Sequence, residues 1–115
     1  MAKSEIEKEL LGKGEFVQID YLGAFLKEDL PTDIRKFAML KMADLYAKKY
    51  MFIESAKIYN NLSIRTIPFK EKIEYHVKEA EMYIKGGSFR DADSAIQRAM
   101  NQANAFEKND IMFNI

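Results

Sequence analysis

Two consecutive stretches of 37 residues decide the fold. Residues 31–67 read PTDIRKFAMLKMADLYAKKYMFIESAKIYNNLSIRTI, and residues 68–104 read PFKEKIEYHVKEAEMYIKGGSFRDADSAIQRAMNQAN. Each stretch begins with a proline, and a constant offset without a gap aligns them. Identical or similar pairs at this offset are Leu40 and Val77, Lys41 and Lys78, Ala43 and Ala80, Asp44 and Glu81, Tyr46 and Tyr83, Lys48 and Lys85, Phe52 and Phe89, Ser55 and Ala92, and Tyr59 and Ile96. A repeat of about 20–50 residues of this kind indicates a helical solenoid.

Apolar residues recur every three or four positions along the chain, which is typical of amphipathic helices. We expect helices over about 4–11, 15–28, 31–49, 52–64, 68–85 and 88–103, and residues 106–115 can begin a seventh. Pro31 and Pro68 suit the first turn of a helix, and Gly86-Gly87 suits a helix end. The predicted fold class is all-α, an α-α superhelix of antiparallel hairpins with about six or seven helices.

The matched residues have a consistent role in this packing. Ala43 and Ala80, with Ser55 and Ala92, are small where two helices must approach closely. The larger matched residues are expected to be largely buried between helices: Tyr46, Phe52, Tyr59, Tyr83, Phe89 and Ile96. Truncation of Phe89 to alanine is therefore expected to cost about 3–5 kcal/mol, the usual penalty for a buried aromatic side chain.

The two units resemble the tetratricopeptide repeat (TPR) family. The residues that carry the resemblance are Ala43-x2-Tyr46, Phe52 and Ser55-x3-Tyr59 in the first unit, and Ala80-x2-Tyr83, Gly87, Phe89, Ala92-x3-Ile96 and Ala99 in the second. The period is atypical, because the family repeat has about 34 residues. We expect one TPR-like domain over 1–115, with a degenerate N-terminal hairpin (1–30), repeat 1 (31–67), repeat 2 (68–104) and a C-terminal cap or further helix (105–115).

The resemblance implies a binding site on the concave face. In the family, the first helix of each hairpin lines a groove that binds peptides. Carried over to this sequence, the groove comprises Phe37, Leu40, Asp44, Ala47, Lys48, Glu74, Val77, Glu81, Ile84 and Lys85. We expect Lys48 and Lys85 to face the same cavity, where they can contact a carboxylate or a backbone carbonyl of the partner.

The composition excludes several classes of protein. Eighteen basic and eighteen acidic residues give a net charge of zero, which argues against a general nucleic-acid binder. The absence of cysteine excludes disulfides and Cys-based metal sites. No apolar run approaches the roughly 18 residues of a membrane span, and residues 1–11 lack the apolar core of a secretory signal. We therefore predict a soluble cytoplasmic protein.

No residue pattern predicts catalysis. His76 is the one histidine, and Glu79 or Glu81 could help it act as a general base or metal ligand. We favour a packing role, because no nucleophile or second ligand is arranged around it. We accordingly predict no catalytic residue, no metal and no cofactor.

The tail carries an apolar cluster that needs cover, with Phe106, Ile111, Met112 and Ile115 as the candidate self-association residues. It either folds back as a cap or completes the stack of a second copy, and we favour the homodimer. The predicted function is a non-catalytic protein–protein interaction module, an adaptor or scaffold that binds a peptide or helix. The alternative is a structural subunit whose surfaces serve homo-oligomerisation only.

Overall fold

The computed structural model describes residues 3–65 and 69–113, except for the side chains of Phe69 and of residues 106–113. These residues form α1 (Lys3–Leu10), α2 (Glu15–Phe25), α3 (Thr32–Lys48), α4 (Phe52–Arg65), α5 (Phe69–Lys85) and α6 (Phe89–Phe113). The described part of the chain contains no strand. The all-α prediction is therefore confirmed. None of the described helices is long and apolar enough to cross a membrane.

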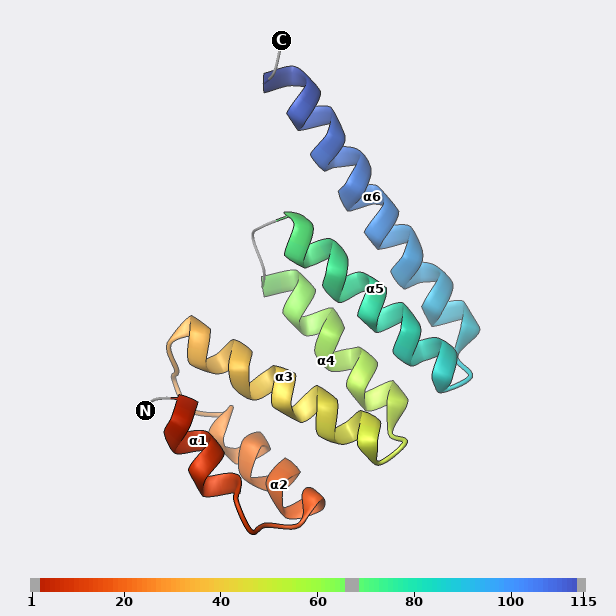
Figure 1. Cartoon of the computed structure of the whole chain (residues 1–115). Helices are drawn as coiled ribbons and strands as arrows, with labels where there is room; N and C mark the ends of the chain where they lie inside the picture. The colour runs from red at the N-terminus through yellow and green to blue at the C-terminus, as the bar shows by residue number, and fades with distance from the viewer. Residues whose placement is uncertain (1–2, 66–68, 114–115) are drawn as a thin grey trace.

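Helices α3 to α6 lie side by side and alternate in direction, so that each packs against the next (Figure 1). Helices α1 and α2 both contact α3 at the N-terminal end of this array. The Cα atoms span 53 × 34 × 18 Å. This elongated shape follows from packing between neighbours in sequence, which is the arrangement expected of stacked hairpins.

The turns of the two later hairpins have the same backbone geometry at the 37-residue offset. The Met51 N–H donates to the Tyr46 carbonyl at 2.9 Å, and the Ser88 N–H donates to the Tyr83 carbonyl at 2.8 Å. The residue before each donor has a positive φ, 59° at Tyr50 and 78° at Gly87. These are the features of a Schellman helix end. The hairpins α3–α4 and α5–α6 therefore repeat in structure as well as in sequence.

Small residues bring the helices of each hairpin together, as predicted. Ala43 and Ser55 are fully buried, and the Ser55 hydroxyl donates to the Ala43 carbonyl at 2.8 Å. Ala80 and Ala92 are buried at the equivalent positions on α5 and α6. A buried alanine leaves no side chain to separate two backbones, so these pairs set the distance between helices.

The apolar core has two parts. One cluster joins α1, α2 and α3, and its buried members are Ile6, Leu10, Ile19, Leu22, Phe25, Ile34, Ala38 and Leu45. The other joins α3, α4 and α5 through Met39, Leu62 and Tyr75. Leu40 and Tyr59 pack against the second cluster. Helix α3 lies between the two clusters, which accounts for its wide apolar arc.

The expected burial of two matched residues is wrong. Phe89 is 67% exposed and Ile96 is 43% exposed, whereas Tyr46, Phe52, Tyr59 and Tyr83 are half-buried. Phe52 is covered by the next hairpin, where Lys85 lies over its ring and Gly86 is in close approach. Within the described residues no further hairpin follows α6 to cover Phe89. The expected loss of about 3–5 kcal/mol for Phe89→Ala does not apply to an exposed ring.

The expected end of the last helix is also wrong. Helix α6 continues without a break from Phe89 to Phe113, so the tail neither folds back as a cap nor forms a seventh helix within the described residues. The chain lacks proline and glycine between Ser88 and Ile115, so no residue there ends a helix readily. The end of α6 extends beyond α5 and away from the other helices (Figure 1).

Candidate protein-binding groove

An open apolar groove of about 390 Å³ lies between α5 and α6. Its walls come from both helices and its floor from alanines, and its lining residues are Ile73, Val77, Ala80, Glu81, Ile84, Ile96, Ala99, Met100 and Ala103. The spacing of three and four residues on each helix places these side chains on one face. We call this surface the α5–α6 groove.

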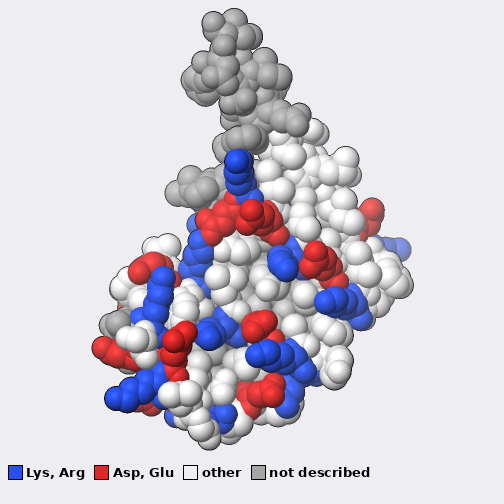
Figure 2. All heavy atoms as spheres, viewed as in Figure 1, with Lys and Arg blue, Asp and Glu red and all other residues white. Residues whose placement is uncertain are grey.

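The walls of the groove are exposed to solvent, although its floor is not. Val77, Ile84, Ile96 and Met100 are 45, 49, 43 and 54% exposed, whereas Ala80 and Ala99 are buried. Figure 2 shows a largely uncharged area along α6, whereas charged side chains of both signs cover much of the rest of this face. A contiguous exposed apolar surface of this kind marks an interaction site more often than scattered apolar residues do.

The same positions of the preceding hairpin are covered. Ser63 is fully buried, whereas its equivalent Met100 is exposed. Tyr59, the equivalent of Ile96, stacks on Tyr75 of α5 with ring centroids 6.4 Å apart. Helix α5 thus packs on the hairpin α3–α4. The equivalent surface of the hairpin α5–α6 has no helix packed on it within the described residues. The occupant that fits this surface is another helix.

The structure divides the predicted groove residues. On α5, Val77, Glu81 and Ile84 line the α5–α6 groove, and Glu74 and Lys85 are exposed outside its lining. On α3, Phe37 and Leu40 pack against the core clusters and Ala47 is half-buried. The remaining predicted residues, Asp44 and Lys48, line a different hollow beside Leu10 and Leu11.

The two predicted lysines make separate contacts in the structure. Lys48 lies 3.6 Å from the Asp44 carboxylate in the hollow beside α1, whereas Lys85 lies over the Phe52 ring, 6.0 Å from its centroid. That they face one cavity stays a prediction, and the contacts that the structure gives them are separate. The physical reason is that Lys85 covers the turn of the preceding hairpin.

Two of the predicted acidic residues, Asp44 and Glu81, affect the pKa of the same residue, Tyr59. Burial raises the pKa of the Tyr59 hydroxyl above its ordinary value, and the negative charges of Asp44 and Glu81 raise this pKa further. These acids come from α3 and α5, on either side of α4. The acidic part of the predicted face therefore exists, but it surrounds Tyr59.

No family model, curated protein or solved structure matches this chain. The geometry of the described residues is therefore the basis for a proposed function.

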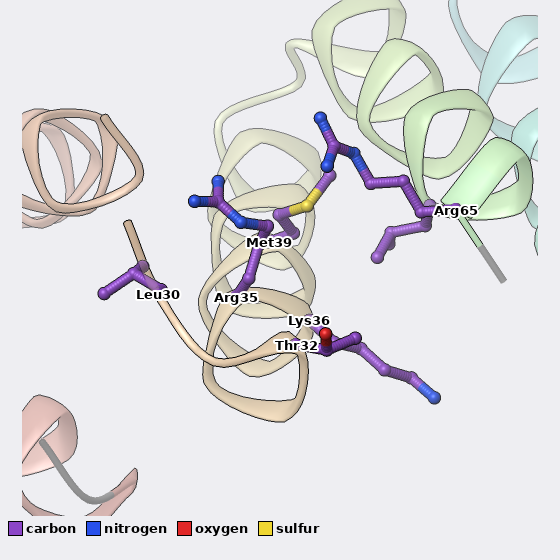
Figure 3. Close-up of a pocket in the computed structure, with 7 residues that line it drawn as sticks. Leu30, Thr32, Arg35, Lys36, Met39 and Arg65 are labelled. Carbon is purple, nitrogen blue, oxygen red and sulfur yellow. The ribbon is translucent and has the colours of Figure 1, made fainter. Parts of the chain in front are cut away.

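A third hollow, of about 320 Å³, has three cations among its lining residues: Arg35, Lys36 and Arg65 (Figure 3). Arg35 donates to the carbonyls of Leu26 and Glu28 at 2.9 and 2.7 Å, so it satisfies the C-terminal end of α2. Lys36 forms an ion pair with Glu71 of α5. Arg35 and Lys36 therefore join α3 to its neighbours, which is a structural role.

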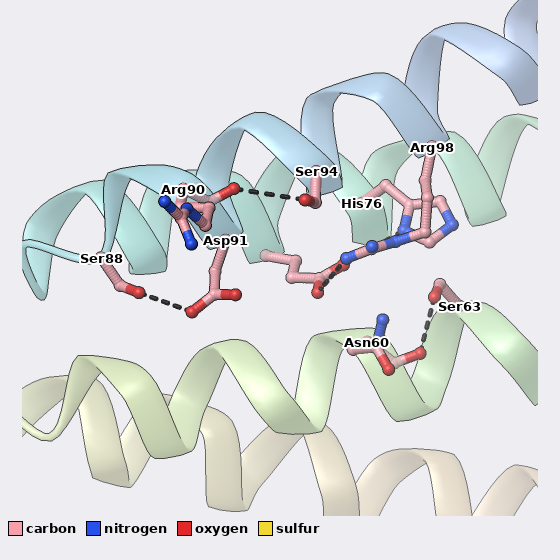
Figure 4. A network of polar contacts seen from close by, with 9 residues as sticks. Asn60, Ser63, His76, Ser88, Arg90, Asp91, Ser94 and Arg98 are labelled. Atoms are coloured by element: carbon pink, nitrogen blue, oxygen red, sulfur yellow. Dashed lines mark hydrogen bonds and ion pairs between the residues drawn. The ribbon is translucent and has the colours of Figure 1, made fainter.

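His76 belongs to a buried polar network between α5 and α6 (Figure 4). Its Nδ1 lies 3.1 Å from Glu79 Oε1, and Arg98 Nη2 donates to Glu79 Oε2 at 2.7 Å. The favoured packing role of His76 fits this position. Sequence reasoning missed the pairing of Glu79 with Arg98, because 19 residues and a turn separate them. The spacing of three residues between His76 and Glu79 was the available signal.

The predicted self-association residues lie at the edge of the described structure. The backbone at Phe106, Ile111 and Met112 is helical, but their side chains lie outside the described part, as does all of Ile115.

Proposed function

We propose that this chain is a non-catalytic protein–protein interaction module that binds an amphipathic helix of a partner chain in the α5–α6 groove. The observation that carries the proposal is the difference between equivalent hairpins. Tyr59 stacks on Tyr75 of α5 and Ser63 is fully buried, whereas Ile96 and Met100 are open. Helix α5 packs on the hairpin α3–α4. A partner helix that packed in the same way on the hairpin α5–α6 would bury the exposed aliphatic walls of the groove.

The chemistry of the groove supports a helix rather than a charged ligand. Glu81 is the one ionisable group among its described lining residues. Apolar anchors at a spacing of three or four residues are what a helix offers to such a groove. Burial of each aliphatic side chain would stabilise the complex by roughly 1 kcal/mol or more, at about 25 cal/mol per Å².

The resemblance to the TPR family supports the same class of function but a different surface. That resemblance favours a concave face built from α3 and α5. On α3, Phe37 and Leu40 of that face pack against the core clusters, and Asp44 and Lys48 pair with one another beside a different hollow. We therefore place the binding site on α5 and α6. The alternative function, a structural subunit that only self-associates, would use the same groove.

A labelled peptide tests the proposal. The probe is a 17-residue amphipathic helix with leucine and alanine on one face and lysine and glutamate on the other, with fluorescein at its N-terminus. Fluorescence anisotropy at submicromolar protein should show binding. Val77→Lys, which puts a charge in the groove wall, should weaken binding at least about tenfold, equivalent to about 1.4 kcal/mol.

Val17→Lys is the matched control. Val17 is also an exposed helical valine, 54% exposed on α2 and outside the groove. Its replacement should leave peptide affinity within about twofold of the wild type. Equal weakening by both variants, or no effect of Val77→Lys, would show that the probe does not use the groove.

A further inference from the structure

The end of α6 projects beyond α5 and away from the other described helices (Figure 1). Helix α6 has 25 residues and α5 has 17, so α6 is longer by about 12 Å at 1.5 Å per residue. Isolated helical segments of this length are marginal in water, and helices are stabilised mainly by packing. The sequence of this segment includes Phe106, Ile111, Met112 and Phe113.

The groove and the projecting segment match, because the groove can accept a helix and the segment is helical. The groove is an open apolar surface between two helices, and the segment is a helix that projects beyond α5 (Figure 1). The segment is continuous with the groove wall, because Ile96 and Met100 precede it on α6. Both features therefore lie at the same end of the array, away from α1 and α2 (Figure 1).

We propose that a second copy of this chain occupies the groove, and that the C-terminal part of its α6 is the helix that binds there. This inference rests on the proposed function of the groove. A two-fold axis makes the contact reciprocal, so each copy gives its helix end and receives that of its partner. Both open surfaces are then covered in one closed dimer.

The charge of the chain permits this association. The net charge is zero, so two copies do not repel one another through an overall charge. The lining residues on α6 are uncharged. Beside the groove, the exposed residues Glu74, Lys78 and Lys85 of α5 alternate in sign with Glu81 of the lining. A surface of mixed sign can pair with a copy of itself, whereas a surface of one sign cannot.

The test measures the mass of the full-length chain in solution. Sedimentation equilibrium from about 1 to 500 μM should show the wild type changing from monomer to dimer. Val77→Lys alters the groove, and the double variant Ile111→Lys with Met112→Lys alters the helix end. Lysine is a good helix former and is favourable near a helix C-terminus, so the double variant should keep α6 intact. Each should weaken dimerisation at least about tenfold, and Val17→Lys should not.

Mixing the two variants gives the sharper result. Each variant alone has a defect in both contacts of the dimer, whereas the mixed pair has one intact groove filled by one intact helix end. We expect the mixture to dimerise more tightly than either variant alone, because a contact already broken by one substitution loses little more from the second. Absence of that gain would overturn the proposed pairing of groove and helix end, even if both variants fold and are monomeric.

The outcome also separates this inference from the function of the groove. A wild-type chain that stays monomeric at 500 μM overturns the dimer, and the groove function then stands if the fluorescein-labelled helix still binds. Failure of the probe to bind the monomeric double variant, in which the groove is intact, overturns the groove function itself.

Discussion

The hairpins α3–α4 and α5–α6 share a repeat and a turn but differ in what covers them. In the first hairpin Ser63 is fully buried and Tyr59 stacks on Tyr75 of α5, whereas Met100 and Ile96 of the second face solvent. The two turns have matching hydrogen bonds and a positive φ at the same repeat position. The difference shows that a repeat specifies the hairpin itself, whereas its neighbours determine which faces are buried.

The covered hairpin should be the more sensitive one. Leu62 is 2% exposed and packs with Met39 and Tyr75. Leu62→Ala is expected to cost about 3 kcal/mol, because the cavity it leaves adds to the lost burial. Urea unfolding followed by circular dichroism measures this loss. Met100→Ala, in the open groove, is the comparison and should cost less than about 1 kcal/mol. Similar losses for the two variants would mean that the hairpins are equally covered.

The hairpin α5–α6 has an ion pair at positions where the hairpin α3–α4 has uncharged residues. Glu79 and Arg98 join α5 to α6, whereas the equivalent positions are Met42 and Asn61. Glu79→Gln should cost about 2 kcal/mol, because the amide cannot offer the charge that pairs with Arg98. Unfolding by urea again reports the change. Glu81→Gln, at an exposed carboxylate, should change stability by less than about 0.5 kcal/mol. If the Glu79→Gln variant is as stable as the Glu81→Gln variant, the ion pair between Glu79 and Arg98 does not stabilise the fold.

Phe52 and Phe89 are equivalent in the repeat, so the burial of one residue type can be compared between the two hairpins. Phe52 is half-buried under the next turn, and Phe89 is 67% exposed. Phe52→Ala should lower the free energy of unfolding by about 2 kcal/mol, and Phe89→Ala by less than about 1 kcal/mol in the monomer. Thermal or urea unfolding at low protein concentration gives both values. A larger loss at Phe89 would contradict the open position of the second hairpin.

Much of the fold could be predicted from the sequence, because the signals are local. The helices from Thr32 to Lys85 begin and end close to the predicted residues, and Ala43 and Ser55 lie where their small size indicated. The length of α6 was missed although the sequence after Ser88 has no glycine or proline. A short apolar tail was interpreted as a separate element, whereas the uninterrupted helical spacing was the better signal.

The site was predicted only in part, for a physical reason. Leu40 and Val77 have the same place in the repeat, so local sequence does not distinguish them. Their burial differs because α5 follows the first hairpin and no further hairpin follows the second within the described residues. The pairing of Glu79 with Arg98 was missed for a similar reason, since it depends on the rotation of α6 about its axis.

Substitutions in the two hairpin turns should change the free energy of unfolding least. They also test whether the two turns are equivalent. Tyr50 adopts a positive φ, which glycine adopts without the steric cost that a Cβ brings. Tyr50→Gly should raise stability by about 0.5–1 kcal/mol, and Gly87→Ala should lower it by about 1 kcal/mol. Careful duplicate urea titrations resolve changes of this size. Opposite signs at the two positions are expected, and a stabilising Gly87→Ala would show that the turns are not equivalent.

The most direct test of the central claim compares accessibility at Ser63 and Met100, which are equivalent in the repeat. The chain has no cysteine, so a single introduced thiol reports one position. The thiols of Ser63→Cys and Met100→Cys would each be reacted with a maleimide. The protein concentration would be submicromolar, which is too low for the proposed dimer to form. Because Ser63 is fully buried and Met100 is 54% exposed, we predict that the Met100→Cys thiol reacts about 100-fold faster, and that the rates become equal in urea. Equal rates in the folded protein would contradict the claim that the second hairpin is an open copy of the first.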